Sequence, residues 1–293
     1  MITPRSGAVA TETFVIGDVE PSIRIAFPTT ADAPTLGLDQ PTRLSGGAAL
    51  TPDALSSATG LDHVPGLRSF LAEACRSQAA AGRSWFRHPP LVLVGAAGFG
   101  RGHVARRIAH LTGVPLVEAC GSELNDAGER EGRSTRGIPI PVLAMALTRC
   151  ANPIVLLDLG EKPLDPLASR RLVEMLDPVR TGRWLDEGLG CVFDLSNVSW
   201  IVQASETSHS IAAIEAHGGR AIATVRCADT REELRRLSIA QQVVCDGEGG
   251  ASDPHMVGNI VSRLRRHFMD DVPTGRALFD HAVALRDRAG SGE

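Results

Sequence analysis

The sequence predicts an α/β fold in which a parallel sheet is followed by a small all-α lid domain. Two observations carry this prediction. Between residues 91 and 226, short apolar runs alternate with helical stretches, and strands separated by helices are typical of a parallel sheet covered on both faces. From Asp229 onward the apolar spacing is helical only, with Asp229 as the expected N-cap.

The elements follow in order along the chain. Residues 1–60 are rich in Pro, Thr, Ala and Gly and are predicted to be an extension with one hairpin between Thr13 and Phe27. A helix is expected over 65–83, where apolar residues recur at helical spacing. Strands are then expected at 91–95, 114–119, 153–158, 198–204 and 221–226, and helices at 102–111, 139–150, 166–176, 209–217, 230–244, 254–270 and 274–288. The predicted domains are an N-terminal extension over 1–60, an α/β core over 61–228 and a helical lid over 229–293.

Composition argues against two classes of partner. The net charge of the 293 residues is −4 at pH 7, so there is no global basic field and no nucleic-acid partner is expected. No apolar run approaches the ~20 residues needed to cross a bilayer, and no N-terminal apolar segment resembles a secretory signal. The six cysteines lack any C-x-x-C pair and are expected to be buried thiols. We therefore expect a soluble, cytoplasmic protein.

The first strand of the core runs into a glycine-rich turn, LVLVGAAGFGRG over 91–102, that predicts a phosphate-binding loop. Such a loop needs G-x-x-x-x-G-K-[ST], so that backbone N–H groups surround the phosphates, Lys neutralises them and the hydroxyl holds Mg²⁺. Arg101 and Gly102 replace the last pair, so the charge moves to a bulkier planar group and the metal-binding hydroxyl is lost. The candidate nucleotide-binding residues of the loop are Gly95, Ala96, Ala97, Gly98, Phe99, Gly100, Arg101 and Gly102.

The same turn also resembles the dinucleotide-binding pattern G-x-x-G-x-x-G of extended short-chain dehydrogenases, so a NAD(P)-binding Rossmann protein stays open as a minor alternative. Glu118 stands about twenty residues downstream, where a ribose-binding carboxylate is expected. However, position 101 is Arg where that pattern has Gly, and the chain contains no Tyr for the catalytic Tyr-x-x-x-Lys of those enzymes. Their usual chemistry is therefore excluded.

Three further motifs follow in a fixed order: PIVLLDLGEK over 153–162, LVEMLDP over 172–178 and VFDLSNVSWIVQAS over 192–205. In this order they resemble the AAA+ module of the Lon protease family and its protease-free relatives, which have close to VFLLDEIDK, LLEVLDP and YDLSxVxFIATAN. The resemblance covers about residues 65–288. It implies a P-loop NTPase-like parallel sheet, the AAA+ core, with a helical lid.

The resemblance assigns roles to single residues. Asp158 matches the acidic residue that directs magnesium, while Leu159 takes the place of the glutamate that polarises the attacking water. Loss of such a base costs about 10²–10⁴ in rate, and Glu161 is the catalytic candidate that could substitute for it if the turn is remodelled. Ser205 matches the polar sensor at the end of the fourth strand, and Arg276, in TGRAL over 274–278, is a candidate phosphate contact.

Other family features are altered. The position of the arginine finger is ambiguous among His217, Gly218 and Arg220. The pore-loop region, 121–137, offers Ser, Thr and Arg in place of the aromatic residue that grips a threaded polypeptide. The family's proteolytic domain would follow the lid, and no protease activity is implied for this sequence.

The altered positions converge on one active centre, whereas the apolar strands are retained. We therefore expect a Lon-like AAA+ protein that binds ATP or ADP, with weak or absent Mg²⁺ binding and weak or lost hydrolysis. It would act as a partner or regulatory subunit in a ring-type homo- or hetero-oligomer of AAA+ subunits, with an unknown protein client. The alternatives are an active AAA+ ATPase with reduced turnover that uses Arg101, Asp158 and Glu161, and a structural domain that binds no nucleotide.

Overall fold

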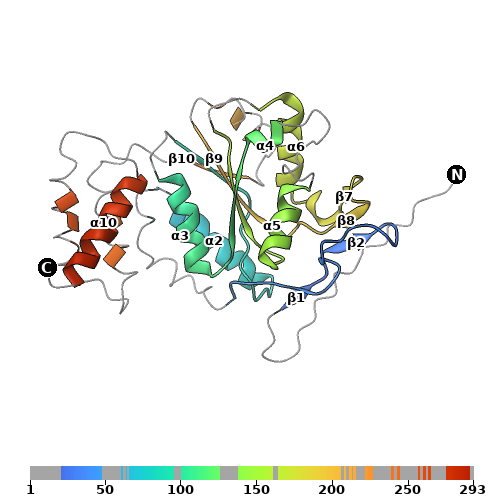
Figure 1. The fold of residues 1–293 in the computed structure, drawn as a ribbon, viewed down its shortest axis with the longest axis horizontal. Coiled ribbons are helices and arrows are strands. Elements are labelled where there is room, and N and C mark those ends of the chain that lie inside the picture. The colour runs from blue at the N-terminus through green and yellow to red at the C-terminus, as the bar shows by residue number, and fades with distance from the viewer. Residues whose placement is uncertain are drawn as a thin grey trace.

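A computed structural model gives the fold of the chain (Figure 1). The residues that it describes are 21–47, 61, 64, 66–95, 100–125, 138–160, 164–205, 208, 211–212, 214–215, 222–226, 239–240, 243–244, 257, 260–261, 263–264 and 275–290. Within these ranges, no helix is both long enough and apolar enough to cross a membrane.

A five-stranded sheet forms the centre of the fold, and all of its pairings are parallel. Its strands are β4 (Leu91–Val94), β5 (Leu116–Cys120), β6 (Ile154–Asp158), β9 (Ser199–Ala204) and β10 (Ala223–Arg226), in the spatial order β10-β4-β9-β6-β5. The predicted α/β class and parallel sheet are confirmed. The first strand lies between the fourth and fifth, whereas the dinucleotide-binding fold places it beside the second. The strand order therefore argues against the Rossmann alternative.

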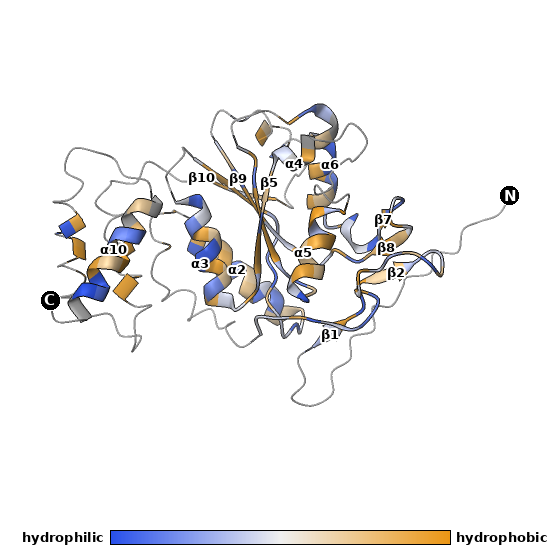
Figure 2. Ribbon diagram, viewed as in Figure 1, coloured by the Kyte–Doolittle hydropathy of each residue, from blue (hydrophilic) through white to orange (hydrophobic). Residues whose placement is uncertain are grey.

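Helices cover both faces of this sheet because its strands are apolar on both sides (Figure 2). Alternate residues of a strand point to opposite faces. Leu91 and Leu93 of β4 accordingly join the core under helices α2 (Leu67–Ala80) and α3 (Arg101–Thr112). Val92 and Val94 join the other core, under helices α5 (Ile140–Thr148) and α6 (Pro166–Leu176). A short helix, α4 (Ser122–Asn125), follows β5.

The N-terminal segment, residues 21–47, packs on the core under α5 and α6. β2 (Ala26–Pro28) pairs with β8 (Cys191–Phe193), which pairs with β7 (Trp184–Asp186), and β1 (Ser22–Ile23) pairs with β3 (Thr42–Arg43). Residues 13–20 of the predicted hairpin lie outside the described residues; its remaining part contributes β1 and β2, which pair with β3 and β8. A short 3₁₀ helix, Thr181–Arg183, precedes β7.

A buried asparagine holds this segment to the core. Asn152 is fully buried, and its Oδ1 accepts from the Ser45 N–H at 2.8 Å. Its Nδ2 donates to the carbonyls of Ser45 and Phe86, both at 2.8 Å. A buried amide is stabilising only when its donors and acceptors are paired. Asn152 meets that condition by bridging residues from two distant parts of the chain.

The C-terminal part has its own small core. Helix α10 (Gly275–Gly290) packs through Ala282 and Leu285 against residues between 239 and 264, and Arg286 Nη1 donates to the Val243 carbonyl at 3.3 Å. In Figure 1 this helix lies on the same side of the sheet as α3. The described residues of this part are helical, as predicted.

His88 fixes the entry into β4. Its ring contacts Phe70 and Phe86, with centroids 5.7 Å apart in both cases, and its backbone N–H donates to Ser199 Oγ at 3.1 Å. The ring Nδ1 lies 2.7 Å from the Pro89 carbonyl, which it contacts as a donor in the neutral form. Burial, with a smaller contribution from the charge of Arg87, lowers the pKa of His88 to about 4.

This pKa predicts a pH-dependent stability. In the unfolded chain His88 takes up a proton near pH 6.5, whereas in the folded chain it does so only near pH 4. The contribution of His88 to the free energy of unfolding therefore has its full value above pH 6.5 and falls as the pH approaches 4. The loss attributable to His88 is about 3 kcal/mol. Denaturant titrations of the wild type and His88→Gln measure it, since the difference between the two should shrink over this range. Parallel pH profiles would contradict the assignment.

Candidate functional site

The predicted glycine loop connects β4 to α3. Gly95 directly follows β4, and Gly100 is the N-cap of α3 with φ 79° and ψ 17°, a left-handed conformation that Gly adopts without a Cβ penalty. Ala96, Ala97, Gly98 and Phe99 lie outside the described residues. A strand, a glycine turn and a helix N-terminus therefore follow one another here, as a phosphate-binding loop requires.

Both ends of the loop are bonded to one acceptor at the end of β9. The Gly95 N–H donates to the Ala204 carbonyl at 3.1 Å, and Arg101 Nη1 donates to the same carbonyl. The Arg101 guanidinium, which we expected at the phosphates, is thus bonded to the sheet. Ser205 follows Ala204, and its carbonyl accepts from the Ser208 N–H at 3.0 Å. Ser205 therefore directly follows the residue whose carbonyl both ends of the loop contact.

Asp158 ends β6 at the same edge of the sheet. Because β9 lies between β4 and β6, Asp158 is paired in register with Gln203 of β9. Its Oδ1 accepts from the Gly160 N–H at 2.9 Å, so the carboxylate stabilises its own turn. Leu159, at the position of the missing base, is buried. Glu161 lies outside the described residues.

Gly121 allows the chain to pass close behind Asp158. Its N–H donates to the Asp158 carbonyl at 2.6 Å. A Cβ at this position would lie 2.8 Å from the Leu159 Cα and 3.0 Å from the Asp158 carbonyl oxygen. Neither atom belongs to a flexible side chain, so only Gly fits without displacing the acidic turn.

Two side chains that the sequence analysis did not select approach Gly102. A Cβ on Gly102 would lie 3.6 Å from Gln203 Oε1 and 3.7 Å from Arg106 Nη1. Arg106 is one helical turn after Gly102, and helical side chains lean toward the N-terminus, which brings its guanidinium back to the start of α3. Helical spacing could have suggested Arg106, but Gln203 follows only from the strand register.

Glu118 of β5 completes this cluster. Its two carboxylate oxygens accept from Arg106 Nε at 2.8 Å and Nη2 at 3.0 Å, a bidentate ion pair in which both side chains are 49% exposed. Glu118 was the ribose-binding candidate of the dinucleotide alternative. In this fold it is bonded to α3 instead.

Helix α10 contacts the start of α3. The rings of His103 and Phe279 have centroids 5.4 Å apart. Arg276, the candidate phosphate contact of the lid, is the second residue of α10, one turn before Phe279. The Arg276 side chain lies outside the described part of the structure. The same holds for residues 126–137 of the pore-loop region and for the arginine-finger candidates His217, Gly218 and Arg220. The backbone of α10 is therefore adjacent to the glycine loop's helix.

The residues present do not fit the expected Mg²⁺ site. Asp158 keeps one carboxylate, but position 102 supplies no oxygen, and the nearest polar groups include a guanidinium, which repels a cation. Within the described residues there is no group of three or more His, Cys, Asp or Glu side chains that could hold a metal ion.

No family model matches the chain. It is 34% identical to the Lon protease of Rhizobium meliloti over 156 residues. This alignment covers 50% of this chain and 18% of that protein. It is 31% identical over 148 residues to Lon protease 1 of Sorangium cellulosum, covering 47% and 18%. A mutant of RuvB from Thermotoga maritima superposes with a TM-score of 0.41 at 14% identity, over 80% of this chain and 71% of that one.

The chain thus spans less than a fifth of the length of these Lon proteases. The resemblance predicted from the ordered motifs is confirmed by this similarity, which supports the AAA+ ATPase class.

The tight passage at Gly121 makes a stability prediction. Gly121→Ala should lower the free energy of unfolding by about 1–3 kcal/mol, because the added methyl group forces the backbone around Asp158 to move. Gly182→Ala is the matched control, since a Cβ there meets nothing within 4 Å. Denaturant titration measures both, and equal stabilities of the two variants would refute the close packing.

Proposed function

We propose that this chain is a Lon-like AAA+ protein that binds ATP or ADP at the glycine loop and hydrolyses it weakly or not at all, acting as a partner or regulatory subunit. The observation that carries the proposal is the loop between β4 and α3, whose two ends are bonded to the Ala204 carbonyl beside Asp158. We also propose the division into residues 1–60, 61–228 and 229–293.

Positive potential at the start of α3 supports phosphate binding. The first N–H groups of a helix lack intrahelical partners and carry the positive end of its dipole. The first turn of α3 contains no acidic residue. Arg101 and Arg106 add two guanidinium groups near the same turn. An anion such as a polyphosphate is the ligand that this arrangement favours.

The same groups argue for nucleotide binding without a metal. Mg²⁺ in phosphate sites is held by oxygen ligands, and Gly102 supplies none. The Arg106 guanidinium lies where a side chain at position 102 would extend, so it can neutralise phosphate in place of the cation when it leaves its ion pair with Glu118. Magnesium is consequently given no role in the proposal.

Hydrolysis is disfavoured by the absence of a base at position 159. Leu159 is buried and apolar, and Asp158 already accepts a hydrogen bond from Gly160. Loss of a general base lowers rates by about 10²–10⁴. An active enzyme with reduced turnover is the second candidate, in which Glu161 would take this role.

We further propose assembly with AAA+ subunits, of this or another chain, in a ring that serves an unidentified protein client. The similarity to Lon proteases supports this part of the proposal. Mass photometry of the purified chain, alone and with a Lon-type ATPase, tests it. A chain that stays monomeric in both samples would refute it.

The metal-independent site makes a binding prediction. A fluorescent ADP analogue should bind the wild type equally well in Mg²⁺ and in EDTA. Gly102→Ser returns a hydroxyl to a position where its Cβ meets Gln203 at 3.6 Å, an ordinary contact, and should bind more tightly with Mg²⁺. Gly102→Ala is the control without oxygen. Wild-type binding that needs Mg²⁺ would overturn the metal-free site, and no binding under either condition would overturn the nucleotide proposal itself.

The hydrolysis proposal is tested separately. Steady-state phosphate release from Mg²⁺-ATP should be about 10²–10⁴ below the ~10 s⁻¹ of an average enzyme. Because Asp158 is assigned no catalytic step, Asp158→Asn should leave this residual rate unchanged. A rate that disappears in Asp158→Asn would favour the active ATPase instead.

A further inference from the structure

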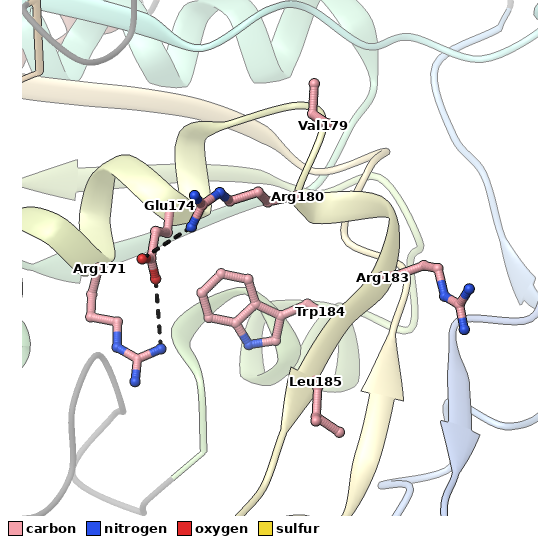
Figure 3. Close-up of a pocket in the computed structure, with 7 residues that line it drawn as sticks. All are labelled: Arg171, Glu174, Val179, Arg180, Arg183, Trp184 and Leu185. Atoms are coloured by element: carbon pink, nitrogen blue, oxygen red, sulfur yellow. Dashed lines mark ion pairs between the residues drawn. The ribbon is translucent and has the colours of Figure 1, made fainter. Parts of the chain in front are cut away.

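A second surface feature lies away from the glycine loop. It is a groove of about 430 Å³ between α6, the turn that follows it and β7 (Figure 3). The residues that line it are Arg171, Glu174, Val179, Arg180, Arg183, Trp184 and Leu185. Helix α6 packs on the core opposite to that of α3, so the groove lies over the other face of the sheet from α3.

The groove exposes large apolar side chains. Among the described residues, the large hydrophobic side chains that are exposed are Leu147, Val179 and Leu185, and two of these three line the groove. Val179 is 88% exposed and Leu185 is 54% exposed. Single exposed apolar residues are common, but two of them that line the same groove as Trp184 indicate an interaction surface.

The charge of the groove is positive. Glu174, with a side chain only 17% exposed, lies 3.1 Å from Arg180, 3.2 Å from Arg170 and 3.7 Å from Arg171, measured between side-chain N and O atoms. Arg180 also pairs with Asp177 at 3.6 Å. Arg183 adds a further cation at the rim, where Figure 3 shows it pointing away from the other side chains. The guanidinium groups therefore outnumber the carboxylates.

Trp184 links the charged and apolar parts. Figure 3 shows its indole between the Glu174 ion pairs and Leu185. Trp and Arg are the residues that dominate binding energy at protein interfaces. The Arg180 side chain is 60% exposed, and Glu174 keeps Arg170 and Arg171 as partners, so Arg180 can exchange its contact with Glu174 for one with a partner's carboxylate. β7, which carries Trp184 and Leu185, is an edge strand of its three-stranded sheet.

We propose that this groove binds an acidic segment of a partner protein that carries an apolar anchor residue. The anchor packs against Trp184 and Val179, and the flanking carboxylates pair with Arg171 and Arg180. The exposed apolar side chains of Val179 and Leu185 offer no contact to a nucleic-acid backbone, whereas an apolar anchor residue packs on them. The charge surplus and the apolar contacts therefore favour an acidic peptide over nucleic acid.

Selection from a random peptide library displayed on phage tests the proposal, with the full-length chain as bait. The enriched peptides should be acidic with a recurring Leu, Ile or Phe, and fluorescence anisotropy of a labelled peptide gives its Kd. Arg180→Glu and Val179→Asp should each weaken binding at least about tenfold, and added salt should weaken it further. Both side chains are largely exposed, so the fold tolerates the changes.

Arg76→Glu is the matched control. Arg76 forms an exposed ion pair with Glu73 at 2.8 Å on α2, which packs on the other core, so its reversal should change Kd by less than about twofold. Enrichment of basic peptides, no enrichment, or a Kd insensitive to both groove variants would overturn the proposal. Self-association, or binding of single-stranded DNA, that is lost in Arg180→Glu while acidic peptides fail to bind would overturn it too.

Discussion

The glycine loop depends on one backbone acceptor, the Ala204 carbonyl at the end of β9. Because β9 lies next to β4 in the sheet, this oxygen receives the N–H that leaves β4 at Gly95 and the guanidinium that begins α3 at Arg101. The two ends of the loop are thereby held at the carboxyl edge of the sheet without a ligand. A loop with fixed ends loses less conformational entropy when it binds, which favours a preformed site.

The same bond also limits the site. A hydrogen bond to a charged group contributes about 1.5–3 kcal/mol, and this bond holds Arg101 Nη1 to the sheet. A Lys would offer a compact ammonium on a flexible stem, whereas Arg101 presents a planar guanidinium that is bonded to the Ala204 carbonyl. Arg106, whose partner Glu118 is half exposed, is the cation that can turn toward phosphate at lower cost.

The regular elements of the core could be predicted because their signals are local. Apolar runs and helical spacing placed β4, β6, α3 and α6 within a few residues, and the position of Asp158 followed from the end of its strand. The antiparallel sheet could not be predicted, because β2, β7 and β8 have three residues each and β2 pairs with β8 across more than half of the chain. The contact of Gln203 with Gly102 was missed for the same reason, since it depends on the register between strands.

Two of the motifs that resemble Lon proteases stabilise the scaffold through hydrogen bonds of their aspartates. In the LDP segment, Asp177 Oδ1 accepts from the Val179 N–H at 2.9 Å and ends α6. In the DLS segment, Asp194 Oδ1 accepts from the Ser196 N–H at 2.9 Å, and the Asp194 N–H donates to the Ile25 carbonyl at 2.9 Å. These contacts shape the chain without touching a ligand. Because these side-chain contacts are structural, they do not depend on catalysis at the glycine loop.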